Sequence, residues 1–221
     1  MSTKLPQAQE VSADPPASAP VIGPRLSAAR KQAGVGVREL ARRIGVSAGL
    51  ISLIENGRSA PSVSTLYAIA RELDLSFDDL FNGSRGSSDA TGPVKVMHRR
   101  ERPTVQLATG VRWERLTHTD RPDFEFLHVV YEVGGASCDA DAKLQHGGQE
   151  YALLLDGALG LTIADEEFRL EPGDSISFDA GAPHRIWNAG DRPARAMWVV
   201  LQRRNDRRIA PEGHRPPSAD D

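Results

Sequence analysis

Hydrophobic positions follow two different periods along the chain, and the change between them falls near residue 90. In the first part they recur at intervals of three and four, as at Leu40, Ile44, Ile51, Ile54, Leu66, Ile69 and Leu73. This spacing places them on one face of a helix. In the second part short runs of β-branched and aromatic residues alternate with turn residues, which is typical of a sandwich or small barrel. We therefore predict a helical domain followed by an all-β domain.

Eight β-rich runs predict the strands of the second domain, at 111–116, 124–133, 151–155, 159–164, 168–170, 175–178, 185–187 and 194–201. Turn pairs such as Asp156-Gly157 and Pro172-Gly173 separate them. No internal repeat is visible.

Composition shifts divide the chain further. Residues 1–22 are rich in Ala, Pro and Ser and predict a disordered arm, and residues 83–93 are a Gly/Ser-rich linker. Residues 203–221 are rich in Arg, Pro and Asp and predict a disordered tail. The helical domain then spans 23–82 and the β-domain spans 94–202.

The segment 37–56 has the residues that a helix-turn-helix needs. Ala41 is small where two helices must cross, and Gly45 suits a turn with positive φ. Ser47 follows that turn as an N-cap for the second helix. Gly36 precedes the first helix and has no side chain with which to cap it. The spacing therefore predicts a helix-turn-helix motif.

Charge is unevenly distributed. The window from Arg25 to Arg58 holds seven basic and two acidic residues, whereas residues 94–202 hold 12 basic and 17 acidic residues. A compact basic patch beside an acidic domain indicates a DNA-binding module attached to a domain with another task. No run approaches the length of a membrane helix, no secretory signal is visible, and Cys138 is the single cysteine, so we expect a cytoplasmic protein without disulfides.

The pieces RLSAARKQAG, RELARRIGVS, ISLIENGRSAPS and LYAIARELDLSFDDLF closely resemble the Cro/CI (XRE-type) DNA-binding domain. The resemblance implies a five-helix bundle with an internal salt bridge between Arg30 and Glu55. It implies base-facing positions at Ser47, Ala48, Gly49, Ser52 and Leu53. It makes Arg38, Arg42, Arg43, Asn56 and Arg58 candidates for phosphate contact. Because the base-facing side chains are small or apolar, we expect thymine-methyl contact and shape readout to carry much of the specificity.

Strand alternation brings three metal-binding residue types together in the β-domain. His146 and Glu150 share a face with Ala152, and His184 shares a face with Asn188 on a later strand. Two His and one Glu form a facial triad, which suits one divalent ion such as Fe, Mn, Ni or Zn. The alternative is that the imidazoles are hydrogen-bonded core or effector-contacting groups without a metal. His128 alternates with Phe124 and Phe126, which favours core packing.

The segment 144–188 resembles the two cupin motifs. His146, Glu150 and Gly157 match the second His, Glu and Gly of the first motif, and Leu144 stands where that motif has its first His. The second motif is matched at Gly173, Gly181, His184 and Asn188, with Asp179 in place of Pro. The resemblance implies a double-stranded β-helix barrel, with an effector pocket at His146, Glu150, His184 and Asn188. It leaves the metal question open.

With both resemblances, the chain is similar to the XRE–cupin family of transcriptional regulators. They imply a homodimer on a double-stranded DNA operator, with a small-molecule effector in the cupin and no enzymatic activity. One alternative is a non-haem iron epoxidase of the same domain order, which would use His146, Glu150 and His184 as ligands. Another is a DNA-binding scaffold whose barrel only dimerises.

Overall fold

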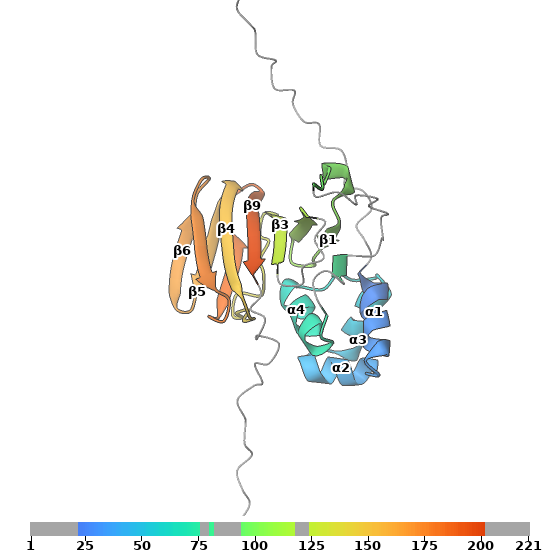
Figure 1. The fold of residues 1–221 in the computed structure, drawn as a ribbon. Coiled ribbons are helices and arrows are strands. Elements are labelled where there is room, and N and C mark those ends of the chain that lie inside the picture. Colours follow the sequence, from blue (N-terminus) through green and yellow to red (C-terminus); the bar gives the residue numbers. More distant parts are fainter. Residues whose placement is uncertain (1–21, 76–79, 82–93, 118–123, 202–221) are drawn as a thin grey trace, which may run out of the picture.

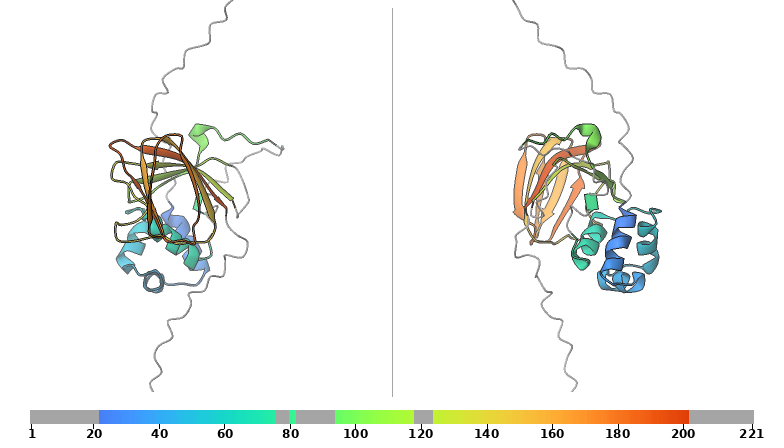
Figure 2. Two further views of the ribbon diagram at one scale, coloured as in Figure 1. Left: turned by 90° about the vertical axis from the view of Figure 1, so that its left-hand side faces the viewer. Right: turned by 45° about the vertical axis from the view of Figure 1, so that its right-hand side comes forward.

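The computed structural model describes residues 22–75, 80–81, 94–117 and 124–201. Within these ranges the chain forms four α-helices, which are α1 (Gly23–Gln32), α2 (Val37–Ile44), α3 (Ala48–Glu55) and α4 (Val63–Glu72). A short 3-10 helix, η1 (Arg99–Glu101), precedes the strands. The helices gather at one end of the β-domain, and α4 is the helix nearest the strands (Figures 1 and 2). No helix of the described residues is long and apolar enough to cross a bilayer.

The number of helices differs from the expected five. Of the segment 76–82, where a fifth helix would lie, only Leu80 and Phe81 are described, and both are helical and buried. They pack into the same core as α1 and α4. The expected arm, linker and tail lie outside the described residues, except for Ile22. Ile22 is buried at the start of α1 and thus belongs to the helical domain.

The local signals of the helix-turn-helix are confirmed. Gly45 ends α2 with φ 75°, in the left-handed region that favours glycine. The Ser47 hydroxyl accepts a hydrogen bond from the Leu50 N–H at 3.1 Å and so caps α3. Gly36 supplies no side-chain cap to α2. Ala41 is buried in the core of the bundle.

The described β-domain contains nine strands: β1 (Thr104–Gln106), β2 (Val111–Arg115), β3 (Phe124–Tyr131), β4 (Gln149–Asp156), β5 (Leu159–Ile163), β6 (Glu166–Leu170), β7 (Ser175–Asp179), β8 (His184–Asn188) and β9 (Ala194–Leu201). All pairings are antiparallel. Six strands form one sheet in the order β1-β2-β3-β9-β4-β7, and three form a second in the order β6-β5-β8. All eight predicted runs are strands, and β1 is an addition that the pattern missed.

The two sheets enclose an apolar core. Alternate residues of β4 are buried at Glu150, Ala152 and Leu154, and those of β8 are buried at His184, Ile186 and Asn188. These are the faces that the alternation predicted. Gly157 sits at the turn after β4 with φ 82°, and a Cβ there would lie 2.6 Å from the Ala194 Cα. That close approach of two backbones explains why a glycine stands at this position.

Candidate functional site

The first candidate site is the outward face of α3. Ile51 and Ile54 point into the bundle core, where each is 1% exposed. The opposite side chains, at Ser52 and Leu53, are exposed to solvent. At the start of the helix Ser47 and Gly49 are also exposed, whereas Ala48 is partly buried. The structure therefore brings the expected base-facing positions onto one accessible surface.

The basic residues beside α3 differ in whether they form ion pairs. Arg38 and Arg58 are exposed and form no ion pair within the part of the chain that the structure describes. Arg42 pairs with Glu39 at 2.7 Å, and Arg43 pairs with both Glu39 and Glu72. Hydrogen bonds from Arg42 and then Arg43 lower the pKa of Glu39 to about 2. Two of the four arginines are therefore already paired with carboxylates, which partly neutralise their charge.

Two other expected residues hold the bundle together. The ion pair between Arg30 and Glu55 is present: Arg30 Nε donates to one carboxylate oxygen at 2.6 Å, and Nη2 donates to the other at 2.8 Å. The hydrogen bond from Arg30 outweighs burial and lowers the pKa of Glu55. Asn56 donates to the Ser52 carbonyl at 2.8 Å and so ends α3. Its side chain remains on the exposed surface.

The second candidate site lies inside the barrel. His146, at the approach to β4, places its Nε2 atom 2.8 Å from Glu150 Oε1. The Nε2 atom of His184, which comes from β8, lies 4.0 Å from the same oxygen. One ligand atom from each of the three residues lies within 4.8 Å of the others. Two sheets thus bring together the three residues that the alternation predicted.

Neighbouring groups orient these side chains. His184 Nδ1 lies 2.9 Å from the Ala182 carbonyl, which favours a proton on Nδ1 and a lone pair on Nε2. His146 Nδ1 lies 3.1 Å from the Gly147 carbonyl in the same way. Its Nε2 atom is buried and has no hydrogen-bond partner among the described residues, although Glu150 Oε1 lies 2.8 Å away. A buried nitrogen lone pair without a donor suits a metal ion.

The charges of the cluster are coupled. Burial in the barrel opposes ionisation of Glu150, but the adjacent imidazoles of His146 and His184 and the Trp198 N–H outweigh it, so the pKa of Glu150 is lowered. The Trp198 bond to Glu150 Oε2 is 2.7 Å long. Burial also lowers the pKa of His184. The deprotonated Glu150 carboxylate is the form in which such a triad would bind a divalent cation.

The cavity around the triad is small, at about 30 Å³. Leu144, Trp113, Tyr131 and Trp198 contribute to its walls, and no Lys or Arg of the described residues lines it. Asn188 does not line it. The Asn188 amide donates to the Tyr131 and Arg192 carbonyls and accepts from the Gly190 N–H, so it fixes a turn instead.

Two features of the cavity were not evident in the sequence. Its wall includes Val63 and Tyr67, which belong to α4 of the helical domain. No periodicity in the sequence indicates a contact between two domains. His128 was expected in the core, but it lies on the outer face of β3, with its Nδ1 atom 3.2 Å from Glu114. The inward positions of β3 are instead Glu125, Leu127, Val129 and Tyr131.

The fold and the two sites define a class of protein: a helix-turn-helix DNA-binding domain joined to a cupin barrel. Comparison with known families gives the same division, since a helix-turn-helix family matches residues 26–80 and the cupin domain family matches residues 127–200. The chain is 26% identical over 166 residues to the HTH-type transcriptional regulator PuuR of Escherichia coli, covering 75% of this chain and 86% of PuuR. It combines a helix-turn-helix domain with a cupin domain and is similar over three quarters of its length to a transcriptional regulator.

Two solved structures are similar to the chain over most of its length. An HTH_3 family transcriptional regulator from Vibrio cholerae superposes with a TM-score of 0.57 at 20% identity, covering 83% of this chain and 96% of that one. It shows the same fold. Hydroxypropylphosphonic acid epoxidase from S. wedmorenis reaches a TM-score of 0.44 at 24% identity, covering 82% of this chain and 97% of the epoxidase. That similarity is too distant to assign an activity.

Proposed function

We propose that this regulator binds a two-fold symmetric operator in double-stranded DNA as a homodimer, and that its barrel cavity receives a small-molecule effector. The observation that carries the proposal is the open face of α3, where Ser52 and Leu53 remain exposed although the neighbouring α4 contacts the barrel. A recognition helix needs this face to enter a major groove. Because the operator is chromosomal, we infer a cytoplasmic location.

The contacts divide by chemistry. Hydroxyls of Ser47 and Ser52 supply hydrogen bonds to base edges, and Ala48 and Leu53 meet thymine methyl groups. Gly49 lets the backbone approach closely. Phosphate contacts come from Arg38, Arg42, Arg43, Asn56 and Arg58, and these position the helix without specifying sequence.

Salt dependence of DNA binding tests this division. A labelled fragment from upstream of the protein's own coding region would be titrated in the presence of excess nonspecific DNA. For Arg38→Ala we expect the slope of log K against log salt to fall by about one unit. For Arg43→Ala we expect a smaller change, since Glu39 and Glu72 already neutralise part of the Arg43 charge.

Arg169→Ala is the matched control. Arg169 is an exposed arginine on β6 of the three-stranded sheet, outside the helical domain. Its slope should equal that of the wild type. An unchanged slope for Arg38→Ala would remove this residue from the interface. Binding that nonspecific competitor abolishes equally for all variants would refute operator recognition itself.

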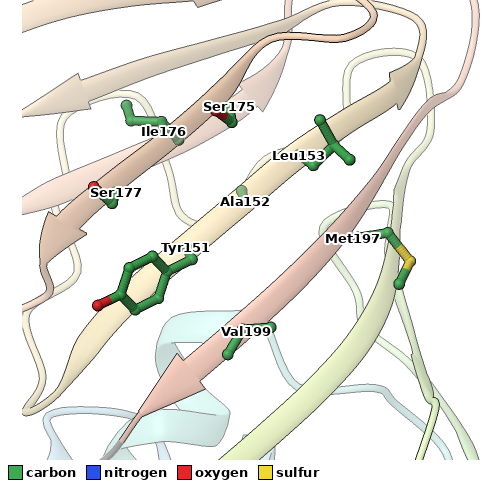
Figure 3. A pocket seen from close by; sticks show the side chains of 8 residues that line it. All are labelled: Tyr151, Ala152, Leu153, Ser175, Ile176, Ser177, Met197 and Val199. Atoms are coloured by element: carbon green, nitrogen blue, oxygen red, sulfur yellow. The ribbon is translucent and has the colours of Figure 1, made fainter.

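The outer face of the six-stranded sheet supports the homodimer. Figure 3 shows Tyr151 and Leu153 of β4 beside Met197 and Val199 of β9. Strand register extends this row to Phe126 on β3, which pairs with Val199. The residues of β4 and β9, together with Ser175, Ile176 and Ser177 of β7, border a hollow of about 350 Å³, and Tyr151 and Leu153 are exposed. An uncharged and mostly apolar surface of this kind suits an isologous contact with a second copy, which the two half-sites of an operator require.

Leu153→Asp tests the dimer, because it places a charge in the centre of this surface. We expect the variant to be monomeric by light scattering at concentrations where the wild type is dimeric. Phe168→Asp is the control: Phe168 is 39% exposed against 40% for Leu153, but it lies on β6 of the other sheet. A dimeric Leu153→Asp protein would show that the copies meet elsewhere.

His146, Glu150 and His184 would hold one divalent ion, and an ion there would offer its remaining positions to an oxygen or nitrogen atom of the effector. We expect metal analysis of the purified protein to find one equivalent of Fe, Mn, Ni or Zn. His184→Ala should lose it, and His128→Ala should keep it because His128 is on the outer face. Equal metal content in the two variants would show that the triad is not the metal site, and its side chains would then contact the effector directly.

The epoxidase-type alternative is favoured by the same three ligands. It is disfavoured by the cavity, which holds no Lys or Arg among the described lining residues with which to bind a phosphonate. Tight operator binding that persists after removal of metal supports the regulator. Stoichiometric iron together with only nonspecific DNA binding would support the enzyme. If the barrel only dimerises, His184→Ala would alter neither ligand binding nor regulation.

A further inference from the structure

Helix α4 closes one end of the barrel. The ring of Tyr67 stacks on the ring of His146 with centroids 4.2 Å apart and planes 10° apart. The same ring meets Trp113 edge to face at 6.0 Å and 78°. Just before α4, the Pro61 carbonyl accepts a hydrogen bond from the Ala108 N–H at 2.9 Å. Directional contacts thus hold the helical domain against the mouth of the cupin cavity.

The space left behind Tyr67 decides what the cavity can receive. It is about 30 Å³, whereas pockets for organic ligands measure roughly 300–1,000 Å³. The remaining volume suits about one water molecule or one metal ion. An organic molecule that reaches His146, Glu150 and His184 therefore needs the volume that the Tyr67 ring occupies.

Tyr67 is the part of the cavity wall that can move away from the barrel. The barrel walls, such as Trp198 and Ile186, are tied into the sheets by strand pairing. Tyr67 is instead partly exposed and belongs to a separate helical domain. Moving α4 away would open the mouth without breaking a sheet.

We propose that Tyr67 is the stopper of the cupin cavity, so that an organic effector and the docked helical domain exclude each other. The inference rests on the proposed effector function of the barrel. The docked state holds α3 of each copy at a fixed orientation relative to the barrel, and hence to the partner's recognition helix. Effector binding releases that orientation and weakens binding to paired half-sites. The helix-turn-helix domain of the second copy then meets its half-site at a lower effective concentration.

p-Cresol, the free form of the tyrosine side chain, is the probe for the stopper. It would be titrated calorimetrically into the full-length wild type, Tyr67→Ala and Tyr67→Phe. Removing the ring leaves a cavity faced by His146 and Trp113, so we expect Tyr67→Ala to bind p-cresol about tenfold or more tightly than the wild type. Tyr67→Phe keeps the ring and should bind it as weakly as the wild type.

Equal affinity of the wild type and a folded Tyr67→Ala for p-cresol would overturn the stopper. If Tyr67→Ala does not fold, Tyr67→Leu makes the same comparison with a shorter apolar side chain that frees part of the ring volume. Hydrogen exchange in the wild type gives an independent measure. Saturating p-cresol should increase exchange of the amides in 63–72, and unchanged exchange with bound p-cresol would contradict displacement of α4.

Operator binding tests the coupling separately. We expect Tyr67→Ala to bind the upstream fragment several-fold more weakly than the wild type, although Tyr67 is not on α3. Phe168→Ala, which removes an exposed aromatic ring from β6, should bind like the wild type. If p-cresol binds as expected but the DNA affinity of Tyr67→Ala is unchanged, the coupling is wrong and the stopper stands. If no protein binds the fragment specifically, the proposed operator function fails, and the p-cresol titration still decides the stopper.

Discussion

The ion pair between Arg30 and Glu55 makes a measurable contribution to the helical domain. Both side chains are 9% exposed, and two parallel hydrogen bonds join them. Arg30 also donates to the Val35 carbonyl at 2.7 Å, so it links α1 to the segment before α2 as well as to α3. Arg30→Met keeps much of the apolar stem but leaves the Glu55 carboxylate unpaired in a largely buried position.

The expected cost follows from this burial. Removing one partner of a buried ion pair typically costs about 3–5 kcal/mol, and exposed pairs contribute about 0–1 kcal/mol. Because Glu55 retains some access to water, we expect a loss near the lower end, about 3 kcal/mol. The double variant Arg30→Met/Glu55→Leu should recover most of it, since no charge is then left unpaired.

The assay can follow each domain separately. All three tryptophans, Trp113, Trp187 and Trp198, lie in the β-domain, so their fluorescence reports barrel unfolding. Far-ultraviolet circular dichroism reports the helices. In urea the dichroism transition of Arg30→Met should move to lower denaturant while the fluorescence transition changes less. Arg42→Ala is the control, because Arg42 is 72% exposed in its pair with Glu39. A loss below about 1 kcal/mol for Arg30→Met would refute the reasoning.

Three further predictions concern other parts of the molecule. A hydrogen bond with His128 and the charge of Arg112 lower the pKa of Glu114 to about 2 from an ordinary value of 4.5, so the barrel should lose about 2–3 kcal/mol as the pH falls from about 4.5 toward 2. Glu114→Gln should flatten that acid dependence in urea titrations followed by fluorescence, and an unaltered profile would assign it to other carboxylates. Ser47→Ala should cost about 1 kcal/mol in the dichroism transition through loss of the α3 cap, whereas no loss would mean that the cap is replaced by water. Gly157→Ala should cost more than about 2 kcal/mol in the fluorescence transition, because φ is 82° and the new Cβ would meet the backbone of the β9 start; a stable variant would show that this turn can relax.

The sequence predicted most of the fold because the two domains follow different hydrophobic periods. It predicted the triad for the same reason: in β4 and β8 the alternation is regular, so residue parity alone gives the inward face. The same argument was wrong on β3, where a charged residue, Glu125, is one of the buried positions. Counting hydrophobic residues there placed His128 inside, although it lies outside.

The remaining differences arise from contacts between distant segments. Asn188 matches a sequence motif that suggests a pocket residue. Its amide instead forms three hydrogen bonds to main-chain groups that only the folded turn brings together. The role of Tyr67 depends on how two domains meet, and helical spacing says nothing about that meeting. Strand β1 is three residues long, which is too short for alternation to reveal.

Leu144 has a consequence for how barrels of this design diverge. Its backbone N–H donates to the His184 carbonyl at 2.7 Å, and its carbonyl accepts from the His184 N–H at 2.8 Å. Position 144, where the first cupin motif has its first His, therefore holds His184 through main-chain atoms, whatever side chain it bears. Replacing leucine by histidine at this point would therefore change a side chain that lines the cavity and leave the main-chain bonds to His184 in place.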